Sequence, residues 1–258
     1  MHSNNIPIYQ KNDFQKMHQA GRLAASVLDQ LYELIKPGIS TLEINDFCHN
    51  LIIKNNAIPA PLNYKGFPKS VCTSVNHVVC HGIPNENKLL NNGDIINVDV
   101  TVILDGWYGD SSRMFVAGKP NKKHLDLLKT TYECLQLGIE NAKPGNHLGD
   151  IGYAIQKYAE GNYFSVVKEY CGHGIGEIYH DEPQILHYGI PNTGMELKEG
   201  MTFTIEPMIN SGGSAVRLLS DGWTVVTKDH SLSAQWEHTI LVTNDGYEVL
   251  TLAPGELI

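Results

Sequence analysis

The 258-residue chain has few basic residues, few cysteines and no long apolar run. No stretch of 18 or more apolar residues occurs, so no helix is predicted to span a membrane. Lys and Arg number 19 against 28 Asp and Glu, and this net charge of −9 argues against general nucleic-acid binding. The first 16 residues are polar and lack the apolar core of a secretory signal, so we expect a cytoplasmic protein.

Cysteine is too scarce and too irregularly spaced to support a disulfide framework. The chain contains five cysteines, an odd number, and no Cys-x-x-Cys pair. A structural zinc finger is therefore not predicted either. Free, reduced thiols are typical of a cytoplasmic protein.

Length and composition predict one domain with a substantial core. Hydrophobic residues make up 42% of the chain, and α/β folds of this size often stay undivided. We therefore expect a single domain over residues 1–258, which includes a short N-terminal segment, residues 1–10.

Helical and strand-like segments alternate along the chain, which predicts an α/β (α+β) architecture of antiparallel sheets backed by helices. Apolar residues recur at helical spacing in four segments, and Ser40 with Glu43 resembles a capping box. The predicted helices are 11–35, 41–55, 121–142 and 148–160. The predicted strands are 70–82, 94–104, 107–117, 164–170, 201–209, 223–227 and 236–243.

Five residues on separate strand-like or Gly-framed segments supply four carboxylates and one imidazole: Asp99, Asp110, His173, Glu206 and Glu237. Burying an unpaired carboxylate is very costly, so four of them on such segments require positive charge nearby. No pattern of Lys or Arg interleaves these positions. The set therefore predicts a site for a pair of divalent cations.

The two aspartates are predicted to share one face of a β-hairpin. Asp105-Gly106 is a strong two-residue turn signal between two β-branched runs. With that turn, Asp110 lies opposite Thr101, whose side chain is on the same face as Asp99. The aspartates are then diagonal neighbours, whereas a one-residue slip would place them on opposite faces.

An internal repeat connects the first acidic strand with a second one. A Lys-Pro-Gly tripeptide, a glycine 55 residues later and an acidic residue six further on occur twice, offset by 107 positions. The matching positions are Gly38, Gly93 and Asp99, and then Gly145, Gly200 and Glu206. Two halves with one layout are predicted to bring their acidic strands to a shared centre. Residues 210–230 break the repeat and are interpreted as a Gly- and Ser-rich excursion in the second hairpin.

Six short motifs carry a resemblance to a known family: Asn97-Val98-Asp99, Tyr108-Gly109-Asp110, Gly172-His173-Gly174-Ile175-Gly176, His180-Asp181-Glu182-Pro183, Thr204-Ile205-Glu206-Pro207 and Gln235-Trp236-Glu237-His238-Thr239. From about residue 10 to its C-terminus the chain resembles the type I methionine aminopeptidases. The resemblance implies the pseudo-twofold pita-bread fold.

The resemblance implies that Asp99, Asp110, His173, Glu206 and Glu237 are the ligands of two divalent metal ions. Asp99 and Asp110 would bind one ion or bridge both, His173 would bind the other, and the two glutamates would complete the pair. Co, Mn, Fe, Zn and Ni all stay open, although oxygen-rich ligands suit Mn, Fe or Co better than thiolate-dependent zinc.

The implied reaction removes an initiator methionine when the second residue is small. Two cations lower the pKa of a water molecule, which attacks the first peptide carbonyl. Glu206 is expected to act as the general base. The resemblance places His81 near the scissile amide nitrogen and gives His180 the role of donor to the developing oxyanion.

A deep apolar pocket is implied for the methionine side chain. Its walls would be Tyr64, Phe67, Cys72, Tyr179 and Trp223. Three positions depart from the commonest bacterial pattern, namely Pro61, Phe67 and Tyr179. His238, next to Glu237, is interpreted as structural or as a support for the metal ligands. Seven histidines are interpreted as ordinary hydrogen-bonded side chains: His2, His18, His49, His124, His147, His187 and His230.

Spacing narrows the subclass to a bacterial-type minimal enzyme. Only 33 positions separate His173 from Glu206, which leaves no room for the large insertion of type II relatives. A monomer acting on nascent chains beginning Met-small is implied, with transient association with the ribosome. Two alternatives stay open at this point: a proline-directed dipeptidase of the same fold, and a pita-bread binding module without catalysis.

Overall fold

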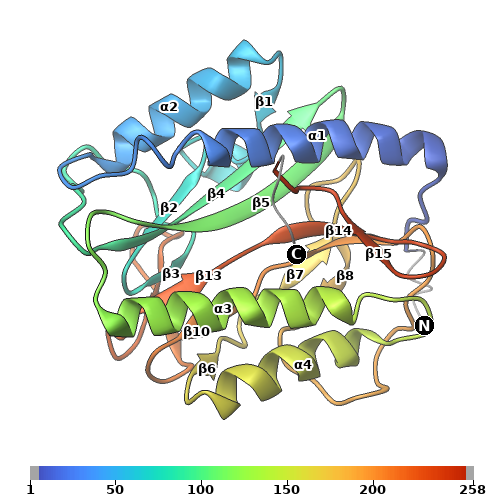
Figure 1. Cartoon of the computed structure of the whole chain (residues 1–258). Helices are drawn as coiled ribbons and strands as arrows, with labels where there is room; N and C mark the ends of the chain where they lie inside the picture. The colour runs from blue at the N-terminus through green and yellow to red at the C-terminus, as the bar shows by residue number, and fades with distance from the viewer. Residues whose placement is uncertain (1–5, 254–258) are drawn as a thin grey trace.

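The computed structural model describes residues 6–253, and its strands lie between two pairs of helices (Figure 1). On one side are α1 (Lys11–Asp29) and α2 (Thr41–Lys54). On the other are α3 (Lys122–Glu140) and α4 (Leu148–Gly161). This arrangement confirms the α/β prediction. Within the described residues, no helix combines the length and apolar character needed to cross a membrane.

The strands form four sheets with antiparallel pairing. In the first, β4 (Ile95–Leu104) pairs with β1 (Ile58–Pro59), β2 (Cys72–Val75) and β5 (Trp107–Val116). The second has the order β15 (Tyr247–Val249), β14 (His238–Val242), β9 (Thr202–Ile205), β7 (Gly172–Gly174), β8 (Asp181–Ile185). Two smaller sheets have the orders β13 (Ser233–Gln235), β10 (Met208–Asn210), β6 (Ser165–Val166), and β11 (Val216–Leu218), β12 (Val225–Thr227), β3 (Val78–Cys80).

The β4–β5 hairpin has the predicted register. Leu104 pairs with Trp107, and Thr101 pairs with Asp110. The turn residues Asp105 and Gly106 both have positive φ, 50° and 85°, as a type I′ turn requires. Because register decides which face each side chain occupies, this pairing aims both hairpin aspartates toward the same side of the sheet.

The internal repeat corresponds to a structural repeat. Helices α2 and α4 begin and end 107 positions apart. The chain ahead of each helix is tied by an isolated bridge, and the two bridges are offset by the same amount. They pair Ser40 with Leu89 and His147 with Glu196.

Two main apolar cores form, each built chiefly from one half, and the halves meet along β5 and β14. Leu28, Ile44 and Val98 belong to the first core, and Ile151 and Phe203 belong to the second. Main-chain and side-chain hydrogen bonds join the halves. The Glu237 backbone N–H donates to the Ser112 carbonyl at 3.0 Å, and Thr239 Oγ1 donates to the Asp110 carbonyl at 2.8 Å. This seam places acidic residues of both halves beside one another.

Several predicted elements are shorter or divided. The helix predicted over 11–35 ends at Asp29, and turns follow in which Leu34 N–H bonds to the Leu31 carbonyl, a tighter i→i−3 spacing. The strand predicted over 70–82 divides into β2 and β3 at Asn76, which has a left-handed φ of 55°. The strand predicted over 201–209 divides at Pro207, which has no backbone N–H to donate.

Other short strands were not predicted, because two to five residues carry too little periodicity. They are β1, β7, β8, β11, β13 and β15. Of the predicted strand 164–170, only β6 forms. The predicted N-terminal segment lies partly outside the described residues, since the structure describes it only from residue 6.

Candidate metal centre

A cavity of about 340 Å³ holds every side chain that the sequence assigned to the site. The five acidic and imidazole residues lie in it together with both proposed catalytic histidines and all five proposed pocket residues. Its lining includes Asp99, Asp110, His173, Glu206, Glu237, His81, His180, Tyr64, Phe67, Cys72, Tyr179 and Trp223. The structure thus brings together residues from both halves of the chain.

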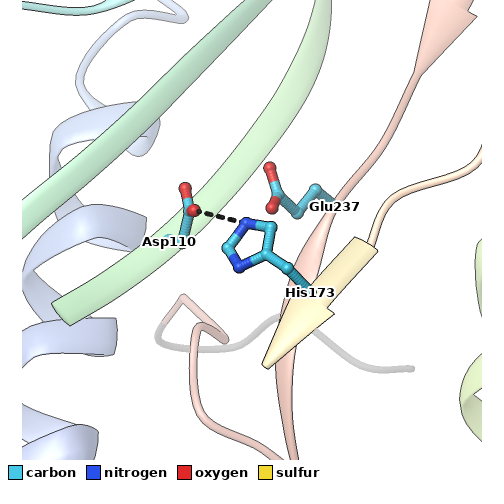
Figure 2. A group of neighbouring side chains, drawn as sticks. All are labelled: Asp110, His173 and Glu237. Atoms are coloured by element: carbon cyan, nitrogen blue, oxygen red, sulfur yellow. Dashed lines mark ion pairs between the residues drawn. The ribbon is translucent and has the colours of Figure 1, made fainter. Parts of the chain in front are cut away.

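Three side chains from three segments converge most closely (Figure 2). One ligand atom from each of Asp110, His173 and Glu237 lies within 4.8 Å of the others. His173 Nε2 is 3.6 Å from Asp110 Oδ2 and 3.8 Å from Glu206 Oε1. An imidazole nitrogen therefore faces carboxylate oxygens of both halves, a geometry that suits a bound cation.

Asp99 extends this group from strand β4. Its Oδ1 is buried and has no hydrogen-bond partner among residues 6–253. Burial raises its pKa well above the ordinary value, and the charges of Asp110 and Glu206 raise it further. An orphaned buried carboxylate oxygen beside other acids is a ligand position for a cation.

The carboxyl groups of Glu206 and Glu237 also have raised pKa values. Burial raises the pKa of Glu206 to about 7, although His173 opposes the shift. Burial, followed by the charges of Asp110 and Glu206, raises the pKa of Glu237 well above its ordinary range. Without a positive ion, these acids therefore retain protons at pH values where free carboxyl groups ionise.

One basic side chain in the cavity lining, Lys65, was not predicted from the sequence to belong to the site. Lys65 is exposed, and its Nζ lies 5.2 Å from the centre of the Tyr64 ring. A solvated ammonium at the rim does not neutralise buried carboxylates. The donor set of carboxylate oxygens and one imidazole fits divalent cations, and thiolates are not required for it.

Hydrogen bonds from neighbouring residues hold Glu206 in place. Thr204 Oγ1 donates to Glu206 Oε1 at 2.8 Å, and Gln235 Nε2 donates to Glu206 Oε2 at 3.2 Å. His187 Nε2 accepts the Glu206 backbone N–H at 3.2 Å. Sequence reasoning gave no role to these three residues. For Thr204 a signal existed, because residues two apart on a strand face the same side.

His180 lies at the mouth of the cavity beside His173. Its ring centre is 4.2 Å from that of His173, and its Nδ1 is 3.1 Å from the Tyr64 hydroxyl. Although part of its surface is open to solvent, burial of the ring lowers its pKa to about 4, and proximity to His173 acts in the same direction. A neutral imidazole can donate one N–H and accept at the other nitrogen.

His81 follows strand β3 with an unusual backbone conformation. Its φ is 55°, in the left-handed region that non-glycine residues adopt at a cost of about 1–3 kcal/mol. Its ring packs edge-on against Tyr170 and Trp223, at 5.6 and 6.1 Å. Burial lowers its pKa. A strained, partly buried histidine with a lowered pKa at a cavity wall is an arrangement typical of functional sites.

Aromatic rings form the apolar end of the cavity. Phe67, 2% exposed, meets Trp223 edge to face at 5.2 Å, and Tyr64 meets Tyr179 at 4.9 Å. Cys72 is buried beside them on β2. Trp223 comes from the excursion that breaks the repeat. The wall is therefore assembled from both halves and is largely apolar.

His238, interpreted from sequence as structural or as a support for the metal ligands, is not part of the cavity lining. Its Nδ1 hydrogen-bonds with Thr251 Oγ1 at 2.9 Å, and burial lowers its pKa to about 3. The ring links β14 to the segment that follows β15. This placement agrees with a structural role.

Comparison with known proteins gives consistent matches over nearly the whole chain. Residues 15–244 match the model of metallopeptidase family M24. Methionine aminopeptidase of Rickettsia prowazekii is 60% identical, covering 98% of this chain and 97% of the relative. Methionine aminopeptidase of Escherichia coli K12 is 54% identical, over 98% and 96%. The crystal structure of the Rickettsia prowazekii enzyme superposes with a TM-score of 0.95, covering 96% of this chain and 100% of that one.

Proposed function

The chain belongs to metallopeptidase family M24, among the methionine aminopeptidases, and we propose that it removes the initiator methionine from nascent proteins whose second residue is small. The observation that carries the proposal is the shared cavity, in which five metal-ligand side chains adjoin an aromatic pocket. It has the pita-bread fold of that family, with two related halves.

The ligands of the metal pair are Asp99, Asp110, His173, Glu206 and Glu237. The buried, unpartnered Asp99 Oδ1 and the three atoms within 4.8 Å support this assignment. Co, Mn, Fe, Zn and Ni are the candidate ions. When bound, two divalent cations supply a water of lowered pKa and withdraw charge from the scissile carbonyl.

Glu206 acts as the proton acceptor. Two hydrogen bonds hold its carboxylate, one to each oxygen, and its backbone N–H is held by His187. The pKa of about 7 that burial gives Glu206 belongs to the metal-free site. The role of general base is therefore supported by the contacts that orient the carboxylate.

His180 donates to the oxyanion, and Tyr64 sets the direction of that donation. When the Tyr64 hydroxyl donates to Nδ1, at 3.1 Å, the neutral ring carries its proton on Nε2. His81 contacts the departing amide nitrogen from the opposite wall. Its neutral state allows it to donate or accept there.

The aromatic end of the cavity receives the methionine side chain. Tyr64, Phe67, Cys72, Tyr179 and Trp223 offer an apolar, polarizable surface that suits a flexible thioether. His81, packed between Tyr170 and Trp223, crowds the position of the second residue. Crowding there favours a small side chain.

Three further properties form part of the proposal. The chain acts as one catalytic domain over 1–258, which the shared seam and cavity of the halves support. It works as a cytoplasmic monomer, and its five free cysteines accord with a reducing compartment. It meets its substrate at the ribosome by transient association, as removal of methionine from nascent chains requires.

The test is release of methionine from the peptide Met-Ala-Ser, with and without added Mn²⁺ or Co²⁺. We expect metal-dependent release. A metal-loaded protein that leaves this peptide intact would support a binding module instead. Preferential cleavage of an X-Pro peptide over Met-Ala-Ser would support a proline-directed dipeptidase.

Specificity at the second residue needs its own series of peptides. Met-Ala, Met-Leu and Met-Lys peptides should be cleaved at rates that fall steeply from Ala to the two larger residues. Equal rates across the series would contradict the crowded rim at His81.

A further inference from the structure

Tyr179 makes a contact that a pocket wall does not need. It is only 9% exposed, and its hydroxyl lies 2.7 Å from Thr101 Oγ1. Thr101, fully buried on β4, in turn donates to Asp110 Oδ1 at 2.7 Å. Two short hydrogen bonds therefore connect Tyr179 with the carboxylate of Asp110, 69 positions away in the sequence.

The direction of this chain is determined by the protons available. An ionised carboxylate only accepts, so Thr101 donates its single hydroxyl proton to Asp110. Thr101 Oγ1 can then only accept from Tyr179, whose phenol must be the donor. Asp110 Oδ1 is thereby held while Oδ2 faces His173 Nε2 at 3.6 Å. Consecutive hydrogen bonds of one direction also strengthen each other.

Packing keeps the phenol in place. The Tyr179 ring stacks on Tyr108, with centres 5.3 Å apart and planes 18° apart. Tyr64 and His180 cover its other sides, at 4.9 and 4.0 Å. A hydroxyl carried on such a confined ring loses little further rotational freedom when it bonds, so it can define the position of Thr101.

We propose that Tyr179 is a positioning residue for the metal centre, acting through Thr101 to orient Asp110, in addition to forming part of the methionine pocket. The inference rests on the proposed function, because it assigns Asp110 as a metal ligand. Partners of metal ligands typically change metal affinity by about 10- to 100-fold when removed. Tyr179 acts one bond further out, so its effect should be smaller.

The test measures Mn²⁺ affinity by isothermal titration, a readout independent of turnover. Tyr179→Phe removes only the hydroxyl and should weaken Mn²⁺ binding by about 3- to 10-fold, with KM for Met-Ala-Ser changed less than twofold at saturating metal. Thr101→Val replaces the threonine hydroxyl with a methyl group of similar size and should weaken Mn²⁺ binding by about 10-fold or more. Tyr108→Phe, on the ring stacked against Tyr179, is the matched control and should bind Mn²⁺ like the wild type.

A double variant gives the sharpest result. If the hydroxyl acts through Thr101, adding Tyr179→Phe to Thr101→Val should produce no further loss of Mn²⁺ affinity. Losses that multiply would overturn the relay. Unchanged affinity in Tyr179→Phe, accompanied by a raised KM, would reduce Tyr179 to a pocket wall. Failure of the wild-type protein to bind Mn²⁺ would overturn the metal centre itself, and the positioning role with it.

Discussion

The two halves of the molecule build nearly the same scaffold but supply different parts of the site. Ahead of α2 and α4, Gly38 and Gly145 both have positive φ, 96° and 85°. Their backbone N–H groups bond to the carbonyls of Leu90 and Leu197, again 107 positions apart. The helix supports of the two halves therefore follow one plan.

The acidic strands differ. In the first half, Asp99 and Asp110 lie within a continuous hairpin of two ten-residue strands. In the second half, Glu206 follows the four-residue β9, and Glu237 precedes the five-residue β14. The excursion between them carries Trp223 into the cavity.

This difference shows how much of the site the repeat explains. The repeated layout brings Asp99 and Glu206 to the shared cavity, and less regular segments of the second half add His180 and Trp223 beside them. A regular sheet fixes side-chain direction through register, whereas loops at strand ends can vary without disturbing it. The repeat therefore accounts for one acid from each half, whereas the aromatic wall combines Tyr64, Phe67 and Cys72 of the first half with Tyr179 and Trp223 of the second.

The largest expected effect is a loss of activity when an acid of either half is replaced, and the loss should be equal for the two halves. Asp110→Asn and Glu237→Gln should each lower kcat/KM for Met-Ala-Ser by about 10³-fold, because each removes a charged ligand of the metal pair. Asp105→Asn, at the exposed turn of the same hairpin, is the control and should retain full activity. If one substitution lowered kcat/KM far more than the other, the two halves would not contribute equally to activity.

Core substitutions at equivalent positions should destabilise the halves alike. Ile44 on α2 and Ile151 on α4 are related by the repeat, and both are 0% exposed. Replacing either with Ala should reduce the unfolding free energy by about 2–5 kcal/mol, measured by urea denaturation. Ile53→Ala, at a position 49% exposed on α2, should have a much smaller effect. A cost confined to one half would show that the cores are not equivalent.

Stability of the metal-free protein should fall as pH rises from about 5 to 7. The pKa of Glu206 is about 7 in the folded state, raised from 4.5, so the folded protein binds more protons than the unfolded chain in this window. Unfolding free energy then decreases with pH, by at most about 1.4 kcal/mol per pH unit for one carboxyl group. Glu206→Gln should reduce the slope by up to this amount, since Asp99 and Glu237, whose pKa values burial also raises, still contribute, and saturating Mn²⁺ should remove most of the dependence. A melting temperature of metal-free protein that rises across this range would contradict the assigned burial of the acid.

The smallest effect concerns the first turns of α2 and α4. Ser40 Oγ accepts the Glu43 backbone N–H at 3.1 Å, while His147 is tied to Asp150 through its own backbone N–H at 2.7 Å. Ser40→Ala should therefore cost about 1 kcal/mol in urea denaturation. His147→Ala keeps the backbone bond and should cost less. The reverse order would show that the caps do not differ as their contacts indicate.

Local signals made some features predictable. The Asp105-Gly106 turn and the alternation around it determine the hairpin register, because both act over neighbouring residues. The start of α2 follows from the capping box and the Pro-Gly before it. By contrast, β7 consists of two glycines around His173 and becomes a strand only because β8 and β9 pair with it. The roles of His187 and Gln235 arise from contacts 19 and 29 positions from Glu206.

The sequence by itself determined the acidic character of the site, the repeated layout and the face of the hairpin that bears Asp99 and Asp110. These follow from composition, spacing and period-two geometry, which are properties of neighbouring residues. Only the tertiary structure decided that Asp110, His173 and Glu237 come within 4.8 Å and that a buried tyrosine reaches one of them through Thr101. Such contacts depend on how β5, β7 and β14 pack across the seam, and packing is a property of the whole chain.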